Sequence, residues 1–252
     1  MVAAAAAGCI DQSPVSPSAS ALIVQAVLDA AATDQYVIVQ STSGAVLQQT
    51  PVKGAQVTLT LPGGRVMTAA EEEDSTIVST RSIEPAVTTI YHFALGAAGV
   101  ALVPGGMYQL RVIVPDGRVV SGSTTIPTAL AARDVAPVRT FDHAKDTLSL
   151  DWPQVAGASS YEVLVRSSRS VFAVFTGTSI MLTGKSTFDG TSAFITGLTH
   201  QLIVSAVDGN YYDYYRQNSG PFTAVGVINH LQGGIGVFGS IVEIERLAIA
   251  VH

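Results

Sequence analysis

Residues 55–61 of the chain read Ala-Gln-Val-Thr-Leu-Thr-Leu, and this stretch decides the fold class of the first half. Apolar and polar side chains alternate strictly, which places Val57, Leu59 and Leu61 on one face of a β-strand and the threonines on the other. The Pro-Gly-Gly sequence at 62–64 then predicts a turn. The stretch therefore predicts a strand with one buried face, followed directly by a second strand.

Short runs of the same kind recur along the chain and are separated by Gly, Pro, Asn and Asp every 8–12 residues or so, which is typical of a β-sandwich or barrel. The first half contains five further predicted strands, at 22–28, 36–40, 87–95, 107–114 and 118–124. The Pro-Asp-Gly turn at 115–117 predicts that the last two form a hairpin. No stretch predicts a helix longer than one turn, so we expect an all-β protein.

The composition excludes several classes of protein. The chain has 252 residues, of which 48% are hydrophobic and 13% charged, so it is neither a disordered chain nor a coiled coil. Its net charge of −6 gives no electrostatic basis for binding nucleic acid. No apolar run approaches the roughly 20 residues that a membrane helix needs.

Residues 148–165 open the second half with two alternating strands. Leu148, Leu150 and Trp152 share one face, and the strand at 161–165 follows after a Gly-Ala turn. The pair resembles the B and C strands of a fibronectin type III domain. Further on, residues 193–199 followed by 202–208 resemble the E strand, the E–F turn and the F strand of that fold.

The first half resembles a different module. Residues 50–59 and 102–112 are similar to two motifs of the transthyretin-like regulatory domains of carboxypeptidases. Together the resemblances imply two β-sandwich domains, a transthyretin-like one at 22–128 and a fibronectin type III-like one with a C-terminal strand extension at 137–252. We place the boundary between them at 130–137.

The N-terminal segment 1–21 predicts a lipid anchor. Cys9 is the single cysteine and follows Ala6-Ala7-Gly8, which resembles the bacterial lipobox, where the cysteine is diacylated after the preceding peptide is removed. The Ser/Pro/Ala-rich residues 11–21 are typical of a flexible tether. The alternative is a cysteine with no role in an alanine-rich tail.

The lipobox, the two halves and the glycine-rich stretch at 233–239 together resemble an uncharacterised family of Gram-negative envelope lipoproteins, a domain of unknown function. Many members of that family are encoded beside TonB-dependent outer-membrane receptors. The resemblance implies an accessory lipoprotein at the outer membrane or cell surface, and it leaves the periplasmic or external side open. It carries over no reaction and no catalytic residue.

Several short motifs point to chemistry, and each has a simpler structural interpretation. Gly234, Gly236 and Gly239 match G-x-G-x-x-G, but no helix follows them, so we expect close backbone packing instead of a dinucleotide site. Residues 183–187 end like a P-loop but lack its first glycine, which predicts a hairpin loop. The acidic run at 71–74 predicts a solvated loop or a weak cation or partner patch.

The sequence contains no catalytic constellation. The five histidines lack metal-ligand spacing, and no serine stands in a G-x-S-x-G elbow. We therefore predict no enzyme activity, no metal and no cofactor.

The segment 210–218 is the strongest candidate for a binding surface, because it holds four of the eight tyrosines. Read as a strand, it places Tyr211, Asp213 and Tyr215 on one face; that face is expected to point outward beside Arg216, since burying an unpaired carboxylate is costly. Exposed tyrosine and arginine suit a protein partner, and stacked rings suit a glycan. The alternative is that both faces are covered and the segment is structural.

These observations predict a non-enzymatic, lipid-anchored accessory binding module, with an outer-membrane receptor, a second copy of itself or a glycan as partner. The alternative function is a structural or adhesive surface protein that assembles into arrays or filaments through strand edges.

Overall fold

The computed structural model describes residues 20–43, 46–74, 88–128, 138–188, 190–217 and 228–252. It is built almost entirely of strands, which confirms the all-β prediction. In the first half the strands are β1 (Leu22–Asp29), β2 (Asp34–Ser43), β3 (Val46–Pro51), β4 (Gln56–Thr60), β5 (Val66–Thr68), β6 (Ala70–Asp74), β7 (Thr88–Ala94), β8 (Met107–Ile113) and β9 (Val119–Thr125). The remaining elements are β10 (Arg139–Phe141), β11 (Thr147–Asp151), β12 (Ser160–Arg166), β13 (Val171–Thr176), β14 (Ser179–Thr183), β15 (Thr187–Phe188), β16 (Thr191–Ser192), β17 (Thr199–Val207), α1 (Gly209–Gln217) and β18 (Ile235–Val251).

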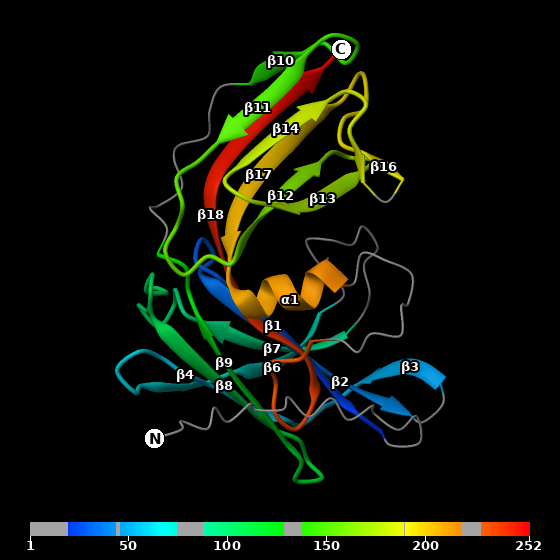
Figure 1. Cartoon of the computed structure of the whole chain (residues 1–252). Coiled ribbons are helices and arrows are strands. Elements are labelled where there is room, and N and C mark those ends of the chain that lie inside the picture. The colour runs from blue at the N-terminus through cyan, green and yellow to red at the C-terminus, as the bar shows by residue number, and fades with distance from the viewer. Residues whose placement is uncertain (1–19, 44–45, 75–87, 129–137, 189, 218–227) are drawn as a thin grey trace, which may run out of the picture.

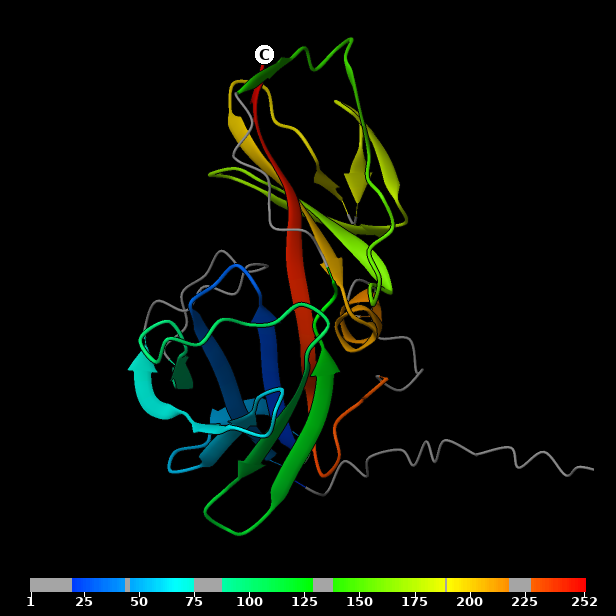
Figure 2. The same cartoon turned by 90° about the vertical axis from the view of Figure 1, so that its left-hand side faces the viewer.

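The long strand β18 runs through both halves of the molecule (Figures 1 and 2). Its first residues, Ile235–Ile241, pair in parallel with β1, and the stretch from Ile241 to Ala250 pairs antiparallel with β17. At about 3.3 Å per residue the 17-residue strand is roughly 55 Å long. One sheet, ordered β13-β12-β17-β18-β1-β2-β7-β6, therefore extends through both halves of the molecule. β3 pairs with β2 of this sheet, and β10 pairs with β18.

The first sandwich consists of the lower part of this sheet in Figure 1 and a second sheet, ordered β5-β4-β8-β9, that packs against it. The predicted alternation of 55–61 is confirmed, because Val57 and Leu59 are fully buried while the threonines face away from the core. Buried side chains from both sheets and from β18 form one core: Leu22, Val24, Ala26, Leu28, Val37, Val39, Val57, Leu59, Leu61, Tyr91, Phe93, Leu95, Leu102, Tyr108, Leu110, Val112, Val114, Val120, Ile126, Leu231, Phe238 and Val242.

The second sandwich sets the two-stranded sheet β11–β14 against β13-β12-β17-β18. Its core includes Leu148 and the inward side chains of β12, as the sequence predicted, with Trp152 half-buried beside Tyr161 at a ring distance of 5.5 Å. Of the E strand, E–F turn and F strand predicted over 193–208, the turn is present, with Gly197 at φ 82°, and so is the F strand, but residues 193–195 form no strand. The strand that pairs with β11 is instead β14, which no sequence pattern predicted.

The glycine-rich stretch before and within β18 serves close backbone packing. Gly236 has φ 126°, and a Cβ placed on it would lie 2.0 Å from the carbonyl oxygen of Val24. The motif therefore lets β18 approach β1, and no helix follows it. The acidic residues 71–74, expected as a loop, belong to β6 at the edge of the large sheet, where charged side chains discourage pairing with another chain.

The predicted boundary at 130–137 lies outside the described residues, and the division of the chain there stays a prediction. Val155 and Ile244 pack against both cores, so the two sandwiches share apolar contacts where they meet. Within the described ranges, no helix combines the length and apolar character needed to span a bilayer.

Candidate binding site

The predicted lipid attachment site, Cys9, lies outside the described residues, as does most of the tether at 11–21. Both stay predictions. The described chain begins at Ser20, whose carbonyl accepts a hydrogen bond from Arg118 at 3.1 Å.

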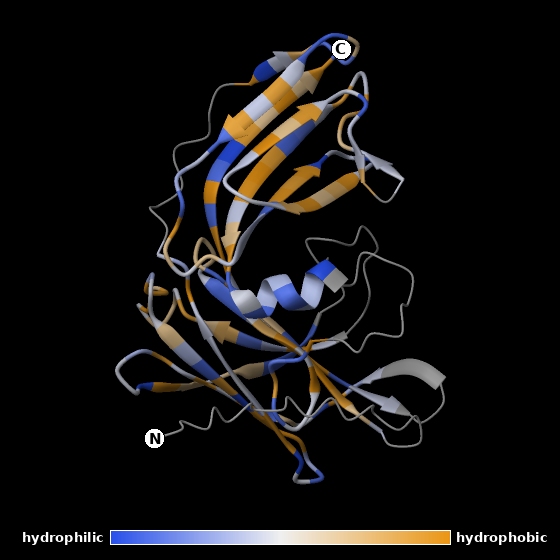
Figure 3. Cartoon of the chain, viewed as in Figure 1, coloured by the Kyte–Doolittle hydropathy of each residue, from blue (hydrophilic) through white to orange (hydrophobic). Residues whose placement is uncertain are grey.

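The tyrosine-rich segment predicted as a strand is the helix α1, so that prediction is wrong. Asp208 stands at its N-cap, and Oδ1 of Asp208 accepts a 2.9 Å hydrogen bond from the backbone N–H of Tyr211. Arg216 lies in the last turn, where a cation interacts favourably with the helix dipole. The helix α1 is hydrophilic along most of its length (Figure 3). It therefore depends on such polar contacts more than on an apolar stripe.

The helical geometry also reverses the predicted exposure of Tyr211. Its side chain is buried, and its hydroxyl donates a 2.8 Å hydrogen bond to Oε2 of Glu162 on β12. The ring of Tyr215, one turn later, lies 4.5 Å away. Tyr211 is therefore a core residue, whereas Asp213 and Tyr215 are half-buried and Arg216 is exposed.

Asp213 connects α1 to the segment before β18. Its carboxylate pairs with Arg216 at 3.0 Å and with Nε2 of His230 at 3.0 Å. The guanidinium of Arg216 also lies 4.8 Å from the ring centre of Tyr212. The helix thus holds His230 in place, and His230 lines the hollow described below.

The buried carboxylate of Asp208 joins the two halves. Oδ2 accepts a 2.6 Å hydrogen bond from the Thr124 hydroxyl, and Oδ1 accepts one from the backbone N–H of Ser240 at 3.0 Å. Burial raises the pKa of Asp208, and these hydrogen bonds oppose the shift only in part. Thr124 lies on β9 and Ser240 on β18, so this one carboxylate binds to elements of both sandwiches.

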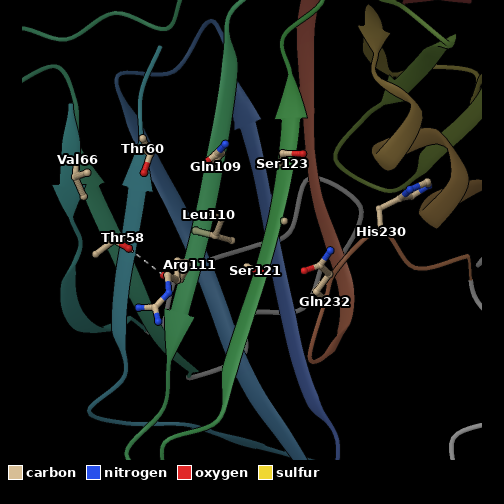
Figure 4. Close-up of a pocket in the computed structure, with 11 residues that line it drawn as sticks. Thr58, Thr60, Val66, Gln109, Leu110, Arg111, Ser121, Ser123, His230 and Gln232 are labelled. Carbon is tan, nitrogen blue, oxygen red and sulfur yellow. Dashed lines mark hydrogen bonds between the residues drawn. The ribbon is translucent and has the colours of Figure 1, made fainter. Parts of the chain in front are cut away.

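An open hollow of about 460 Å³ lies on the outward face of the β5-β4-β8-β9 sheet, and we call it the polar trough (Figure 4). Its side chains come in rows across neighbouring strands. One row runs Thr58, Arg111, Ser121 and Gln232, and the next runs Val66, Thr60, Gln109 and Ser123. Leu110, Gly122 and His230 complete the lining.

Arg111 is the central charge of the polar trough. It is exposed, and within the described residues its guanidinium makes no ion pair or hydrogen bond. None of the lining residues is acidic, although the chain carries 19 Asp and Glu. The trough therefore offers hydroxyl, amide, imidazole and guanidinium groups to a ligand.

Metal binding finds no support among the residues that the structure describes, because no three His, Cys, Asp or Glu side chains group suitably there. Both ring nitrogens of His92 are already hydrogen-bonded, to Asp34 at 2.9 Å and Glu72 at 3.1 Å. Burial on its own lowers the pKa of His92, but the two carboxylates outweigh it and raise the pKa above the usual value.

The polar trough is not evident from the sequence, although part of its signal is present there. Thr58 and Thr60 were identified as the outward face of their strand, and Gln109 and Arg111 alternate with buried neighbours in the same way. Alternation within one strand does not show which strands lie beside it, and so does not show which outward faces form one surface. His230 and Gln232 reach the trough through a bridge between Ser121 and Gln232 that no local pattern predicts.

Two solved structures are similar to the chain. The fibronectin domains FN1–FN3 of chicken CNTN1 are 12% identical over 90% of this chain and 66% of that one, with a TM-score of 0.22. A Ca²⁺-stabilized adhesin that helps an Antarctic bacterium reach out and bind ice is 11% identical over 93% of this chain and 50% of that one, with a TM-score of 0.21. The chain thus spans about two thirds and one half of their lengths. Neither likeness assigns a function to it.

No curated protein matches the chain. The family model described as "Domain of unknown function (DUF4249)" matches residues 10–245, which is most of its length. This match confirms the predicted resemblance to an uncharacterised family, while the lipoprotein and transthyretin-like details stay predictions. The chain therefore belongs to the DUF4249 family, a domain of unknown function.

Proposed function

We propose that this protein is a non-enzymatic binding module that holds a polar ligand in the polar trough. The observation that carries the proposal is the position of Arg111, a guanidinium without an ion pair in the described structure and surrounded by neutral hydrogen-bonding side chains. A cation in this setting is free to make charge-assisted hydrogen bonds to a ligand, and these are the strong ones.

The backbone beneath the trough favours binding because it is preorganised. β8 pairs along its whole length with β9, and over Gln109–Ile113 also with β4. The side chains therefore start from fixed backbone positions, which reduces the entropy lost on binding.

We place this module at the outer membrane or cell surface of a Gram-negative bacterium, anchored by a lipid on Cys9. The lipobox-like residues before Cys9 support the anchor. The resemblance to lipoproteins encoded beside TonB-dependent receptors supports a role as an accessory to such a receptor.

Site-specific photo-crosslinking in cells tests the proposed binding face. A photoreactive residue at Gln109, in the trough, should give a specific adduct with an envelope component. The matched control is Met181 on β14, which is 70% exposed and remote from the trough. Adducts at Met181 alone, or equal adducts at both positions, would contradict the proposal.

Fractionation tests the anchor separately. The Cys9→Ser variant should move from the membrane fraction to the soluble fraction, because each buried methylene of an acyl chain contributes about 0.8 kcal/mol. An unchanged distribution together with an intact mass lacking lipid would contradict lipidation.

A second candidate function, assembly through strand edges, is favoured by the β11–β14 sheet. Within the described ranges, neither outer edge of this pair meets another strand. Open edges are templates for pairing with another chain. Sedimentation over a wide concentration range distinguishes the two functions: ordered polymers would support assembly, and a monomer throughout would contradict it.

A further inference from the structure

We infer that the ligand of the polar trough is an anionic oligosaccharide, a sugar chain that carries carboxylate or sulfate groups. The inference rests on the proposed function and narrows it to a class of ligand.

The charge of the trough points to an anion. Its lining contains Arg111 and no acid, in a chain whose net charge is −6. Asp213, the carboxylate that contacts the lining residue His230, is already paired with His230 and Arg216. An acidic group above Arg111 therefore meets a cation without meeting a carboxylate of the lining.

The backbone on both sides of Arg111 is not free to bind a peptide strand. Gln109 and Arg111 on β8 are paired on both sides, to β4 and β9. On the far side of β9, the backbone N–H and C=O of Ser121 are both bonded to Gln232, at 3.0 and 2.8 Å. Addition of a peptide strand needs an open sheet edge, and neither β8 nor β9 at Ser121 offers one. Recognition must then come from side chains.

Those side chains form a two-dimensional set of hydrogen-bonding groups. Strands lie about 4.8 Å apart and outward residues repeat about every 6.8 Å along each strand, so hydroxyls and amides recur at fixed intervals. Thr60, Ser121 and Ser123 can each donate and accept a hydrogen bond, and Thr58, whose hydroxyl already donates to the carbonyl of Arg111 at 3.3 Å, can accept one. Such groups suit the many hydroxyls of a sugar chain.

Apolar groups at one side of the trough complete the match. Val66 is 58% exposed and lines the hollow, and Met107, 54% exposed, stands on the same face of β8 as Gln109. They offer contact to the C–H faces of sugar rings. The hollow is open, so a chain longer than one sugar fits across it.

Isothermal titration of the full chain with oligogalacturonate tests the inference, with a neutral maltooligosaccharide of equal length as the reference. The wild type should bind the uronate, and binding should weaken with salt. Arg111→Gln should weaken it about tenfold or more, as expected for loss of a charge-assisted hydrogen bond. Thr60→Val, which keeps the charge, should weaken it by a smaller factor of about two to five.

Arg139→Gln is the matched control, since Arg139 is exposed on β10 and distant from the trough. It should leave binding unchanged. Equal losses in both arginine variants, or equal binding of the neutral sugar, would overturn the inference. So would no binding of either sugar; in that case an adduct at Gln109 would still support the proposed function, and its absence would remove both.

Discussion

The hydroxyl of Thr124 donates a 2.6 Å hydrogen bond to the buried carboxylate of Asp208. Thr124 belongs to β9 of the first sandwich, and Asp208 stands between β17 and α1 of the second. The same carboxylate accepts the backbone N–H groups of Tyr211 and Ser240. A single side chain therefore caps the helix and joins the two halves.

Asp208→Ala should lower the free energy of unfolding by about 3 kcal/mol, because it removes an N-cap and leaves buried donors without an acceptor. Asp208→Asn should cost about 1 kcal/mol, since its amide oxygen still accepts the backbone N–H groups. Urea denaturation measures both. Asp151→Ala, at an exposed position of β11, is the control and should stay within about 0.5 kcal/mol. A loss no larger in Asp208→Ala than in this control would refute the assigned role.

Gly236→Ala should destabilise the protein by about 3 kcal/mol or more, because a Cβ at φ 126° would lie 2.0 Å from the carbonyl oxygen of Val24. The contrasting position is Gly177, where an added methyl group would meet nothing within 4 Å. Gly177→Ala should change stability by about 0.5 kcal/mol at most. Thermal unfolding of the two variants side by side checks the requirement, and equal melting temperatures would contradict it.

His200 should make folding stability fall at acid pH. It is fully buried, and its Nε2 accepts a 3.1 Å hydrogen bond from the backbone N–H of Ile195, which requires an unprotonated nitrogen. Burial lowers the pKa of His200 below the usual 6.5, and the backbone of Leu198 opposes this only in part. The unfolded chain therefore takes up the proton first, so stability falls as the pH drops below about 6.5.

His200→Gln should remove this component while keeping an acceptor for Ile195. Once the pH is below both pKa values, each unit by which the folded pKa of His200 lies below the unfolded pKa lowers the free energy of unfolding by about 1.4 kcal/mol. Urea midpoints of wild type and variant between pH 7 and 5 measure the difference. His92 acts in the opposite direction and is present in both proteins, so it cancels. Parallel pH profiles would contradict the prediction.

Tyr211→Phe should lower the free energy of unfolding by about 1–3 kcal/mol, because it removes the bond to Glu162. Tyr212→Phe, on a half-buried ring of the same helix that packs against Phe175, is the control and should have a smaller effect. Chemical denaturation at pH 7 checks both. The reverse order would mean that Tyr211 is the surface residue the strand interpretation predicted.

The two sandwiches should depend on each other. Leu231 and Phe238, from the C-terminal part of the chain, pack in the first core, and Ile235–Ile241 pairs with β1. Separately produced fragments 1–128 and 138–252 should therefore associate, which size-exclusion chromatography detects. A fragment 138–252 that stays monomeric and folded when mixed with the other would contradict this dependence.

Local pattern by itself predicted most strands of the first sandwich. Alternation at 55–61 placed Val57 and Leu59 inward, and the turn at 115–117 gave the β8–β9 hairpin. Alternation is a property of neighbouring residues, so the sequence carries it directly. Local pattern did not predict the fold of the tyrosine-rich segment. Its helix depends on a capping acid, Asp208, more than on periodicity.

The sequence by itself determined the all-β class, the inward faces of the main strands and the glycines that close packing requires. Tertiary structure alone decided that β18 serves both sandwiches, that Tyr211 is buried, and that Thr58, Arg111, Ser121 and Gln232 share one row. The physical reason is the distance along the sequence between the residues that determine each feature. A strand's faces follow from its own residues, whereas the neighbours of a strand depend on the packing of cores assembled from distant segments.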